Sequence, residues 1–254
     1  MVMTDLWNVL GLTGADVVAC VGAGGKTSVL LTLAACAQRR SLPVVVTTTT
    51  KMYASQAVDF TPVFSESYEE GEEQVTAALA ERGSCAWFRG VGRDKLIGVP
   101  PEWIDRFATP RKGATVLVEA DGAGEKMLKT PAAHEPVVPI STTITAGVIN
   151  LKVLGMPLTH QFVHRPEHTC AFLDKVAGTI IGLRDLALVA SKRDGIFQYS
   201  RKKRVLILTG AEGKKSACGH EFVSYLKQYE SLVTRCILTG GFGPMMEVLE
   251  VWDL

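Results

Sequence analysis

The feature that most constrains the fold is an apolar strand pattern that runs directly into glycines and then into a helical pattern. Residues 16–21 read DVVACV, residues 22–28 read GAGGKTS, and residues 26–39 carry apolar side chains at helical spacing. A second apolar strand pattern, PVVVT, follows at residues 43–47. Strand, glycines, helix and strand in this order predict a βαβ unit with parallel strands and a right-handed crossover.

The rest of the chain continues this alternation of strands and helices, and no internal repeat or low-complexity linker interrupts it. We therefore expect an α/β fold with a mostly parallel sheet and helices on both faces. We expect residues 1–254 to form a single domain, with residues 142–180 as a candidate small insert facing the cleft. The patterns predict further helices over residues 66–82 and 219–229, helix starts at Pro101 and Pro166, and strands over residues 85–88, 95–99, 114–119, 142–150, 204–209 and 232–239.

Composition and charge limit which cellular compartment and which kinds of partner we expect for this chain. The chain has 254 residues, 47% hydrophobic and 21% charged, with a net charge of +1, so it offers no general attraction to nucleic acid or acidic membranes. Six cysteines are scattered without a C-x-x-C pair. The N-terminus lacks a secretory pattern, and the apolar run at residues 27–37 is shorter than the roughly 20 residues a membrane span needs. We expect a cytoplasmic protein with no nucleic-acid or membrane partner.

The residues between the first strand and the first helix, which we call the glycine loop (residues 22–28), are typical of a phosphate-binding loop. Backbone N–H groups at a helix N-terminus can hold phosphate oxygens, and glycines let the backbone approach closely. A lysine adds a point charge at the β- and γ-phosphates, and a hydroxyl can bind Mg²⁺. The pattern predicts a P-loop NTPase-like domain in which ATP or GTP and Mg²⁺ are bound by Gly22, Ala23, Gly24, Gly25, Lys26, Thr27 and Ser28, with Thr27 on the metal and Lys26 also catalytic.

The match to the common P-loop motif is incomplete. In G-x-x-x-x-G-K-[ST] the first glycine would occupy position 20, where this chain has Cys20. The loop has the tighter form G-x-x-G-K-T-S. A glycine turn that only joins a strand to a helix is the alternative interpretation.

Polar residues follow two other predicted strands. Glu119 and Asp121 come after the apolar run at residues 115–118, as the metal-side acid of a P-loop site does. We expect the two acids to have different roles: Asp121 binds Mg²⁺, and Glu119 orients a water or another nucleophile. Lys51 follows four threonines at the end of the second strand, where ligands bind in doubly wound sheets, so we expect it to contact phosphate or substrate. Solvated acids and strand-forming threonines are the alternatives.

Several segments together resemble one known family. The segments VGAGGKTS, TTTTKMY, KLIGVPPEWID, VEADGAGEKMLKTPAAHEPVVP and VHRPE are similar to those of the YqeC family of selenium cofactor biosynthesis proteins. The resemblance covers most of residues 6–180. It implies a P-loop protein that helps to mature selenium-dependent molybdenum hydroxylases, with such a hydroxylase or its cofactor as a partner.

The resemblance also suggests substrate-binding residues. Its K-x-P-x-x-x-E-P stretch falls on residues 129–136 and contributes the candidates Lys129, His134 and Glu135. Lys51 in the TTTTK segment and Arg165 in the VHRPE segment complete the set. Relatives tend to carry an N-K-x-D-like segment after a late strand, where this chain reads LTGAE at residues 208–212. The residues that would frame guanine are absent there, and SKRD at residues 191–194 falls earlier, so ATP and GTP both remain open.

Three histidines are spaced by four residues. His160, His164 and His168, with Cys170 nearby, would share one face of a continuous helix and could bind a soft metal. Pro166 interrupts that helix. The alternative is that they are loop and cap residues, with His164 and Arg165 facing the ligand cleft.

Three functions remain open at this stage. The first is an NTPase or nucleotide-dependent transferase in selenium or molybdenum cofactor maturation. The second is a small-molecule kinase or ATP-dependent ligase with an acceptor pocket built from Lys129, His134 and Arg165. The third is a nucleotide-controlled switch or chaperone with little intrinsic turnover.

Overall fold

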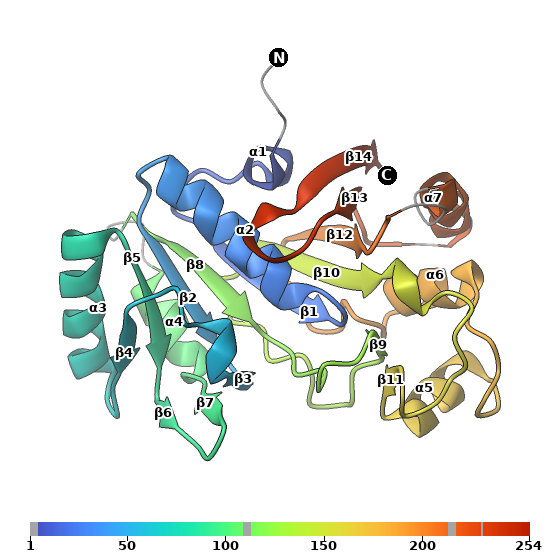
Figure 1. The fold of residues 1–254 in the computed structure, drawn as a ribbon, viewed down its shortest axis with the longest axis horizontal. Coiled ribbons are helices and arrows are strands. Elements are labelled where there is room, and N and C mark those ends of the chain that lie inside the picture. Colours follow the sequence, from blue (N-terminus) through green and yellow to red (C-terminus); the bar gives the residue numbers. More distant parts are fainter. Residues whose placement is uncertain (1–4, 109–112, 213–216, 230) are drawn as a thin grey trace.

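A nine-stranded sheet forms the centre of the molecule. The computed structural model describes residues 5–108, 113–212, 217–229 and 231–254. Within them, eight strands of the sheet run parallel, and β14 at one edge pairs antiparallel with its neighbour. In spatial order the strands are β14 (Glu247–Asp253), β13 (Arg235–Gly240), β12 (Lys203–Thr209), β10 (Ile144–Asn150), β1 (Val17–Gly22), β8 (Thr115–Glu119), β2 (Val44–Thr48), β5 (Ser84–Phe88) and β4 (Pro62–Phe64) (Figure 1).

Two small sheets and several helices complete the described chain. One small sheet contains β6 (Gly90–Val91), β7 (Lys95–Ile97) and β3 (Lys51–Tyr53), and the other contains β9 (Leu128–Lys129) and β11 (Val163–His164). The helices are α1 (Leu6–Leu10), α2 (Lys26–Arg39), α3 (Tyr68–Arg82), α4 (Pro101–Phe107), α5 (Pro166–Leu173), α6 (Leu183–Ser191) and α7 (Cys218–Gln228), with short 3₁₀ turns η1 (Ala54–Gln56), η2 (Leu151–Val153) and η4 (Gly243–Met245).

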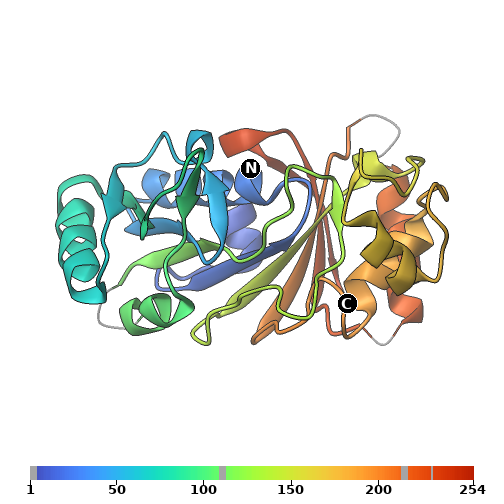
Figure 2. The same ribbon diagram turned by 90° about the horizontal axis from the view of Figure 1, so that it is seen from below.

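Helices cover both faces of the sheet, and the alternation of side chains along β1 shows how. Val18 and Cys20 point to one face and pack with α1 and α2. Val17, Ala19 and Val21 point to the other face and pack with α3 and α4. Farther along the same sheet, β10, β12 and β13 pack against α5, α6 and α7 (Figures 1 and 2). Strands buried on both faces are continuously apolar, which is the pattern the sequence shows.

The expected fold class is confirmed, and most predicted elements are present. The predicted helix at residues 26–39 coincides with α2, and the predicted strand at residues 16–21 is β1 shifted by one residue. The sequence patterns did not predict α1, α6, β3, β4 or β14, or the two-residue strands. Residues 142–180 contribute β10 to the central sheet and then form η2, β11 and α5. In the described part of the chain, no helix combines the length and apolar character that a membrane span requires.

The position of β1 determines where a site can form. This strand lies between β8 and β10, and the three carboxyl ends meet at one edge of the sheet. Ligands of open parallel sheets bind at the carboxyl ends of the strands. The glycine loop leaves β1 at this edge and leads directly into α2.

Candidate functional site

The glycine loop has a backbone that only glycine tolerates at several positions. Gly22, Gly24 and Gly25 have φ of 90°, 74° and 144°, values that other L-residues rarely adopt. A Cβ at Gly22 would lie 2.4 Å from the Val148 carbonyl oxygen, and a Cβ at Gly24 would lie 2.4 Å from the Asn150 Cβ. The loop is therefore a tightly built turn against β10, and its glycines are required by packing as well as by φ.

The N-terminus of α2 presents unpaired amide groups. The N–H groups of Gly22 and Ala23 are used within the protein, donating to Asp121 Oδ2 (3.2 Å) and the Val148 carbonyl (3.0 Å). In the described residues, no protein acceptor pairs with the N–H groups of residues 24–28. Since α2 is 14 residues long, its dipole adds positive potential at this end. Unpaired amides at a helix N-terminus can bind an anion.

A cavity of about 1090 Å³ opens in front of these amides. We call it the central cavity. It is large enough for a nucleotide-sized ligand. The predicted site residues that line it are Gly24, Gly25, Lys26, Thr27, Ser28, Lys51, Glu119, His134, Glu135 and Arg165. Of the described residues proposed from the sequence, Gly22, Ala23, Asp121 and Lys129 do not line it.

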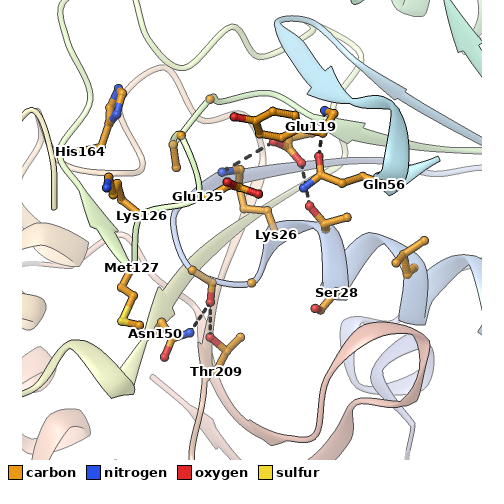
Figure 3. Close-up of a pocket in the computed structure, with 18 of the residues that line it drawn as sticks. Lys26, Ser28, Gln56, Glu119, Glu125, Lys126, Met127, Asn150, His164 and Thr209 are labelled. Atoms are coloured by element: carbon orange, nitrogen blue, oxygen red, sulfur yellow. Dashed lines mark hydrogen bonds and ion pairs between the residues drawn. The ribbon is translucent and has the colours of Figure 1, made fainter. Parts of the chain in front are cut away.

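Lys26, Thr27 and Glu119 form one cluster at the loop. The Lys26 Nζ donates to the Gly22 carbonyl (2.9 Å) and lies 3.9 Å from Glu119 Oε1. The Thr27 hydroxyl donates to Glu119 Oε2 (3.3 Å). Figure 3 shows Lys26 and Glu119 pointing toward one another at the mouth of α2. Burial raises the pKa of Glu119, although the Lys26 charge and the Thr27 hydrogen bond oppose the shift.

Asp121 belongs to a different and more buried network. Its Oδ2 accepts from the Gly22 N–H, and its Oδ1 accepts from Lys129 Nζ. Lys129 has no exposed surface, and it also donates to the Gly122 carbonyl (2.7 Å) and to Glu135 Oε2 (2.9 Å). Asp121 thus connects the glycine loop to Lys129 behind the wall of the cavity.

Glu135 carries this network to the cavity surface. Arg165 Nη1 donates to its Oε2 (3.1 Å), and the Ala132 N–H donates to the same oxygen (3.2 Å). Burial alone would raise the pKa of Glu135, but the hydrogen bond and charge of Lys129 outweigh burial and lower this pKa to about 2. Glu135 is therefore ionised at every physiological pH, and it holds Arg165 at the rim of the central cavity.

The three histidines do not form one cluster. His160 Nε2 pairs with Glu167 (2.7 Å), and His168 Nε2 bonds to the Pro131 carbonyl (2.7 Å). His164, on β11, lines the central cavity beside Arg165. Among the described residues, no three His, Cys, Asp or Glu side chains are grouped as metal ligands would be. The structure thus favours the interpretation of these histidines as loop and cleft residues.

Two residues that the sequence analysis missed hold the glycine loop from the other side. Asn150 Nδ2 and Thr209 Oγ1 both donate to the Gly24 carbonyl, at 2.8 and 2.7 Å (Figure 3). They are register partners at the carboxyl ends of β10 and β12. Their position at the ends of strands that face the glycine loop could have identified them as site residues from the sequence. Other cavity-lining residues that were not proposed from the sequence include Tyr53, Gln56, Lys95, Lys126, Met127, Lys152, Glu212 and Phe242.

The fold and the loop together define a P-loop-type α/β protein. More narrowly, the chain belongs to the YqeC family, since the family model described as "YqeC protein" matches residues 18–167. A protein of Escherichia coli (strain K12), described as "Uncharacterized protein YqeC", is 30% identical over 183 residues, which cover 72% of this chain and 70% of that protein. The resemblance inferred from the sequence is therefore confirmed.

One solved structure also resembles the fold. Chloroplast FtsY from Physcomitrella patens aligns with a TM-score of 0.46 and 17% sequence identity. The alignment covers 95% of this chain and 64% of the FtsY chain.

Proposed function

We propose that this chain binds a nucleoside triphosphate, ATP or GTP, together with Mg²⁺, and that the glycine loop holds the phosphates. The observation that carries the proposal is the set of unpaired amides of residues 24–28 at the mouth of α2, facing a nucleotide-sized cavity. Lys26 lies within the same loop and adds a positive charge there. The first N–H groups of any helix lack a partner within the helix, and at α2 no side chain of the described residues caps them and they open onto a cavity instead.

The donor set at this mouth suits Mg²⁺. The Thr27 hydroxyl and the Glu119 carboxylate lie 3.3 Å apart and both line the central cavity, so two hard oxygen donors converge there. When bound, Mg²⁺ would neutralise phosphate charge. We propose Thr27 and Glu119 as the residues that hold it, directly or through water.

This proposal gives Glu119 and Asp121 roles that differ from those expected from the sequence. Both carboxylate oxygens of Asp121 already accept hydrogen bonds from Gly22 and Lys129. We therefore propose that Asp121 positions the glycine loop and that Glu119 takes the metal-side role. Direct contact between Asp121 and Mg²⁺ remains a prediction, which nucleotide binding by Asp121→Asn with and without Mg²⁺ tests.

The best test of nucleotide binding is thermal stabilisation by ATP and GTP, with and without Mg²⁺. A bound ligand at 100 times its Kd stabilises the folded state by about 2.7 kcal/mol, which is a measurable shift in Tm. We expect a Mg²⁺-dependent shift that Lys26→Ala abolishes. Lys227→Ala removes the same charge from an exposed position on α7 and should leave the shift unchanged.

Two results would overturn the proposal. One is a wild-type protein that gives neither a Tm shift nor heat by calorimetry with any nucleoside triphosphate. The other is an undiminished shift in Lys26→Ala, which would remove the lysine from the site.

A transfer reaction is the second candidate function, and the extent of the cavity favours it. Beyond the glycine loop the central cavity continues to Lys51, His134, Glu135 and Arg165. Cations at this end suit an anionic acceptor, and Lys129 supports Arg165 through Glu135 from behind the wall. A kinase or ligase should show nucleotide hydrolysis or transfer stimulated by a small acceptor. A switch or chaperone should turn over slowly until a protein partner is added.

The biological setting we propose is maturation of selenium-dependent molybdenum hydroxylases. The chain belongs to the YqeC family, and the resemblance of its sequence to that family implied this setting. A partner hydroxylase or its cofactor would then supply the acceptor. Co-purification of this chain with such a hydroxylase, dependent on nucleotide, tests the proposal, and no association with or without nucleotide would contradict it.

A further inference from the structure

The segment that joins β13 to β14 is fixed against the helix that presents the glycine loop. The Thr32 hydroxyl of α2 donates to the Gly243 carbonyl (2.9 Å), and the Met246 N–H donates to the same hydroxyl (3.3 Å). The Gly243 N–H donates to the Ser28 hydroxyl (3.2 Å). These three buried hydrogen bonds hold the segment, which includes η4, beside the first turns of α2 (Figure 1). It is therefore part of the wall of the site and keeps a defined position.

This segment presents an aromatic side chain to the cavity. Phe242 lines the central cavity and is 85% exposed, more than any other large hydrophobic residue in the described ranges. An aromatic face in a cavity gains free energy when a flat ligand covers it. Met245, three residues later, is 79% exposed but does not line the cavity, so exposure alone is not what places Phe242 there.

The sheet order places Phe242 on the side of α2 opposite Glu119. Glu119 ends β8, on one side of β1, whereas Phe242 follows β13, which lies on the other side beyond β10 and β12. The first turn of α2 repeats this division, because Thr27 contacts Glu119 and Ser28 contacts Gly243. A triphosphate whose last phosphate lies near Thr27 and Glu119 therefore directs its nucleoside toward Phe242.

Polar groups lie on the same side as Phe242. Lys152 Nζ and Glu212 Oε2 form an ion pair (3.0 Å), and both residues line the cavity near the carboxyl ends of β10 and β12. The pair is about half exposed, so both groups can exchange water for a ligand. Together they offer hydrogen-bond donors and acceptors to the edge of a planar base.

We propose that Phe242 is the stacking platform for the base of the bound nucleoside triphosphate, with Lys152 and Glu212 at the base edge. This inference rests on the proposed function, since it assumes that the phosphates lie on the glycine loop. It adds a nucleoside subsite formed by the ends of β10 and β12 and by the β13–β14 segment. Stacking on one face tolerates more than one base, so the platform itself does not choose between ATP and GTP.

The test compares nucleotides with a ligand that has no base. Titration calorimetry in Mg²⁺ measures the Kd of ATP, GTP and inorganic tripolyphosphate for the wild type, Phe242→Ala, Phe242→Trp and the neighbouring control Met245→Ala. Loss of one stacked base costs about tenfold in affinity. We expect Phe242→Ala to weaken the nucleotides by about this factor and to leave tripolyphosphate unchanged. Phe242→Trp and Met245→Ala should both retain nucleotide affinity.

The outcomes separate this inference from the proposed function. If the wild type binds nucleotides and tripolyphosphate equally, or if Phe242→Ala weakens neither nucleotide, the platform is wrong while the phosphate site stands. If Phe242→Ala weakens tripolyphosphate as much as the nucleotides, the residue acts on the loop and the stacking role is wrong. If the wild type binds none of the three ligands, the proposed function itself fails.

Discussion

The two sides of the α2 N-terminus use different chemistry to hold the same loop. On the β8 side the contacts are charged and buried: Glu119 is 6% exposed, Asp121 1%, and Lys129 not at all. On the β10 and β12 side the contacts to the loop are neutral, from the Asn150 amide and the Thr209 hydroxyl. The charges on this second side, Lys152 and Glu212, are about half exposed.

The difference shows on which side of the glycine loop the protein buries charged groups. Buried ions are costly unless they are paired, and the β8 side pairs its ions in two groups, Lys26 with Glu119 and Asp121 with Lys129 and Glu135. Such paired charges are useful beside a polyanion and a metal, where charge changes during binding. Neutral hydrogen bonds suffice on the other side, where the uncharged part of a nucleotide would lie. If this comparison is correct, substitutions on the two sides should differ in size and in what they affect.

The largest expected effect is on stability, from Lys129→Met. This change leaves Asp121 buried without its cation and removes the strongest partner of Glu135. Breaking a buried ion pair from one side costs about 3–5 kcal/mol in the free energy of unfolding. Urea denaturation measures it.

The matched control for that prediction is Lys152→Met, which breaks the half-exposed pair with Glu212. We expect a loss below about 1 kcal/mol, as for other exposed pairs. The double change Asp121→Asn with Lys129→Met should recover part of the stability, because no unpaired carboxylate is then left at position 121. Equal losses for Lys129→Met and Lys152→Met would remove the contrast between the two sides.

The next effect separates the two acids on the β8 side. Glu119→Gln removes the charge beside Thr27, so we expect the Mg²⁺-dependent gain in nucleotide affinity to fall by about 10- to 100-fold, the range for loss of a group that supports a metal. Asp121→Asn should weaken binding equally with and without Mg²⁺, because its contact is with the Gly22 backbone. Calorimetry in Mg²⁺ and in EDTA distinguishes them. A selective loss of the metal effect in Asp121→Asn would restore Asp121 as the metal ligand.

The pH dependence of metal binding should follow from the burial of Glu119. Burial raises the pKa of this carboxyl, and Mg²⁺ needs the ionised form. As pH falls, metal-dependent binding should therefore be lost at a higher pH than it would be with an ordinary glutamate. Below the pKa of Glu119 in the folded protein, the affinity for Mg²⁺ should fall about tenfold per pH unit. Wild-type and Glu119→Gln titrations of nucleotide affinity against pH measure this.

In the metal-free protein, the raised pKa of Glu119 has the opposite effect: lowering the pH increases the free energy of unfolding instead of weakening binding. Because the folded state favours the protonated carboxyl, Glu119 contributes stability that is present below its ordinary pKa and is lost as pH rises through the raised value. Glu119→Gln should remove that part of the pH dependence of unfolding without metal. A metal-binding midpoint at or below that of an ordinary glutamate would contradict the role of burial.

Local patterns predicted the elements whose signals lie within a few residues. The glycines, the lysine and the apolar spacing predicted β1, the loop and α2, because strand, turn and helix preferences are all local there. The contacts of Glu119 and Asp121 could not be predicted in this way. β8 ends at Glu119, so Asp121 lies in the following loop and turns back to Gly22, which spacing along the sequence could not show.

Non-local contacts explain what the sequence did not show. A lysine is usually exposed, and Lys129 is buried only because Asp121 and Glu135 converge on it. Asn150 and Thr209 are 59 residues apart and meet at the loop through the pairing of β10 with β12. The edge strand β14 was also missed, since its residues alternate between exposed and half-buried with acids among them.

The smallest expected effect tests the neutral side. Thr209→Val removes one of two hydrogen bonds to the Gly24 carbonyl and nearly preserves shape, so we expect a loss of about 1 kcal/mol in unfolding free energy. Because the glycine loop is then held less firmly, nucleotide affinity should also fall, by less than the roughly fivefold change that about 1 kcal/mol corresponds to.

Thr239→Val is the matched control for this last change. Thr239 is buried on β13, donates to the Leu208 carbonyl (2.9 Å) and does not line the central cavity. Its loss should lower stability by a similar amount, because the bond removed is of the same kind, yet leave nucleotide affinity unchanged. If the two variants weakened nucleotide binding equally, affinity would follow global stability. The hydrogen bonds of the neutral side would then have no specific effect on the glycine loop. The two sides would differ only in their charge.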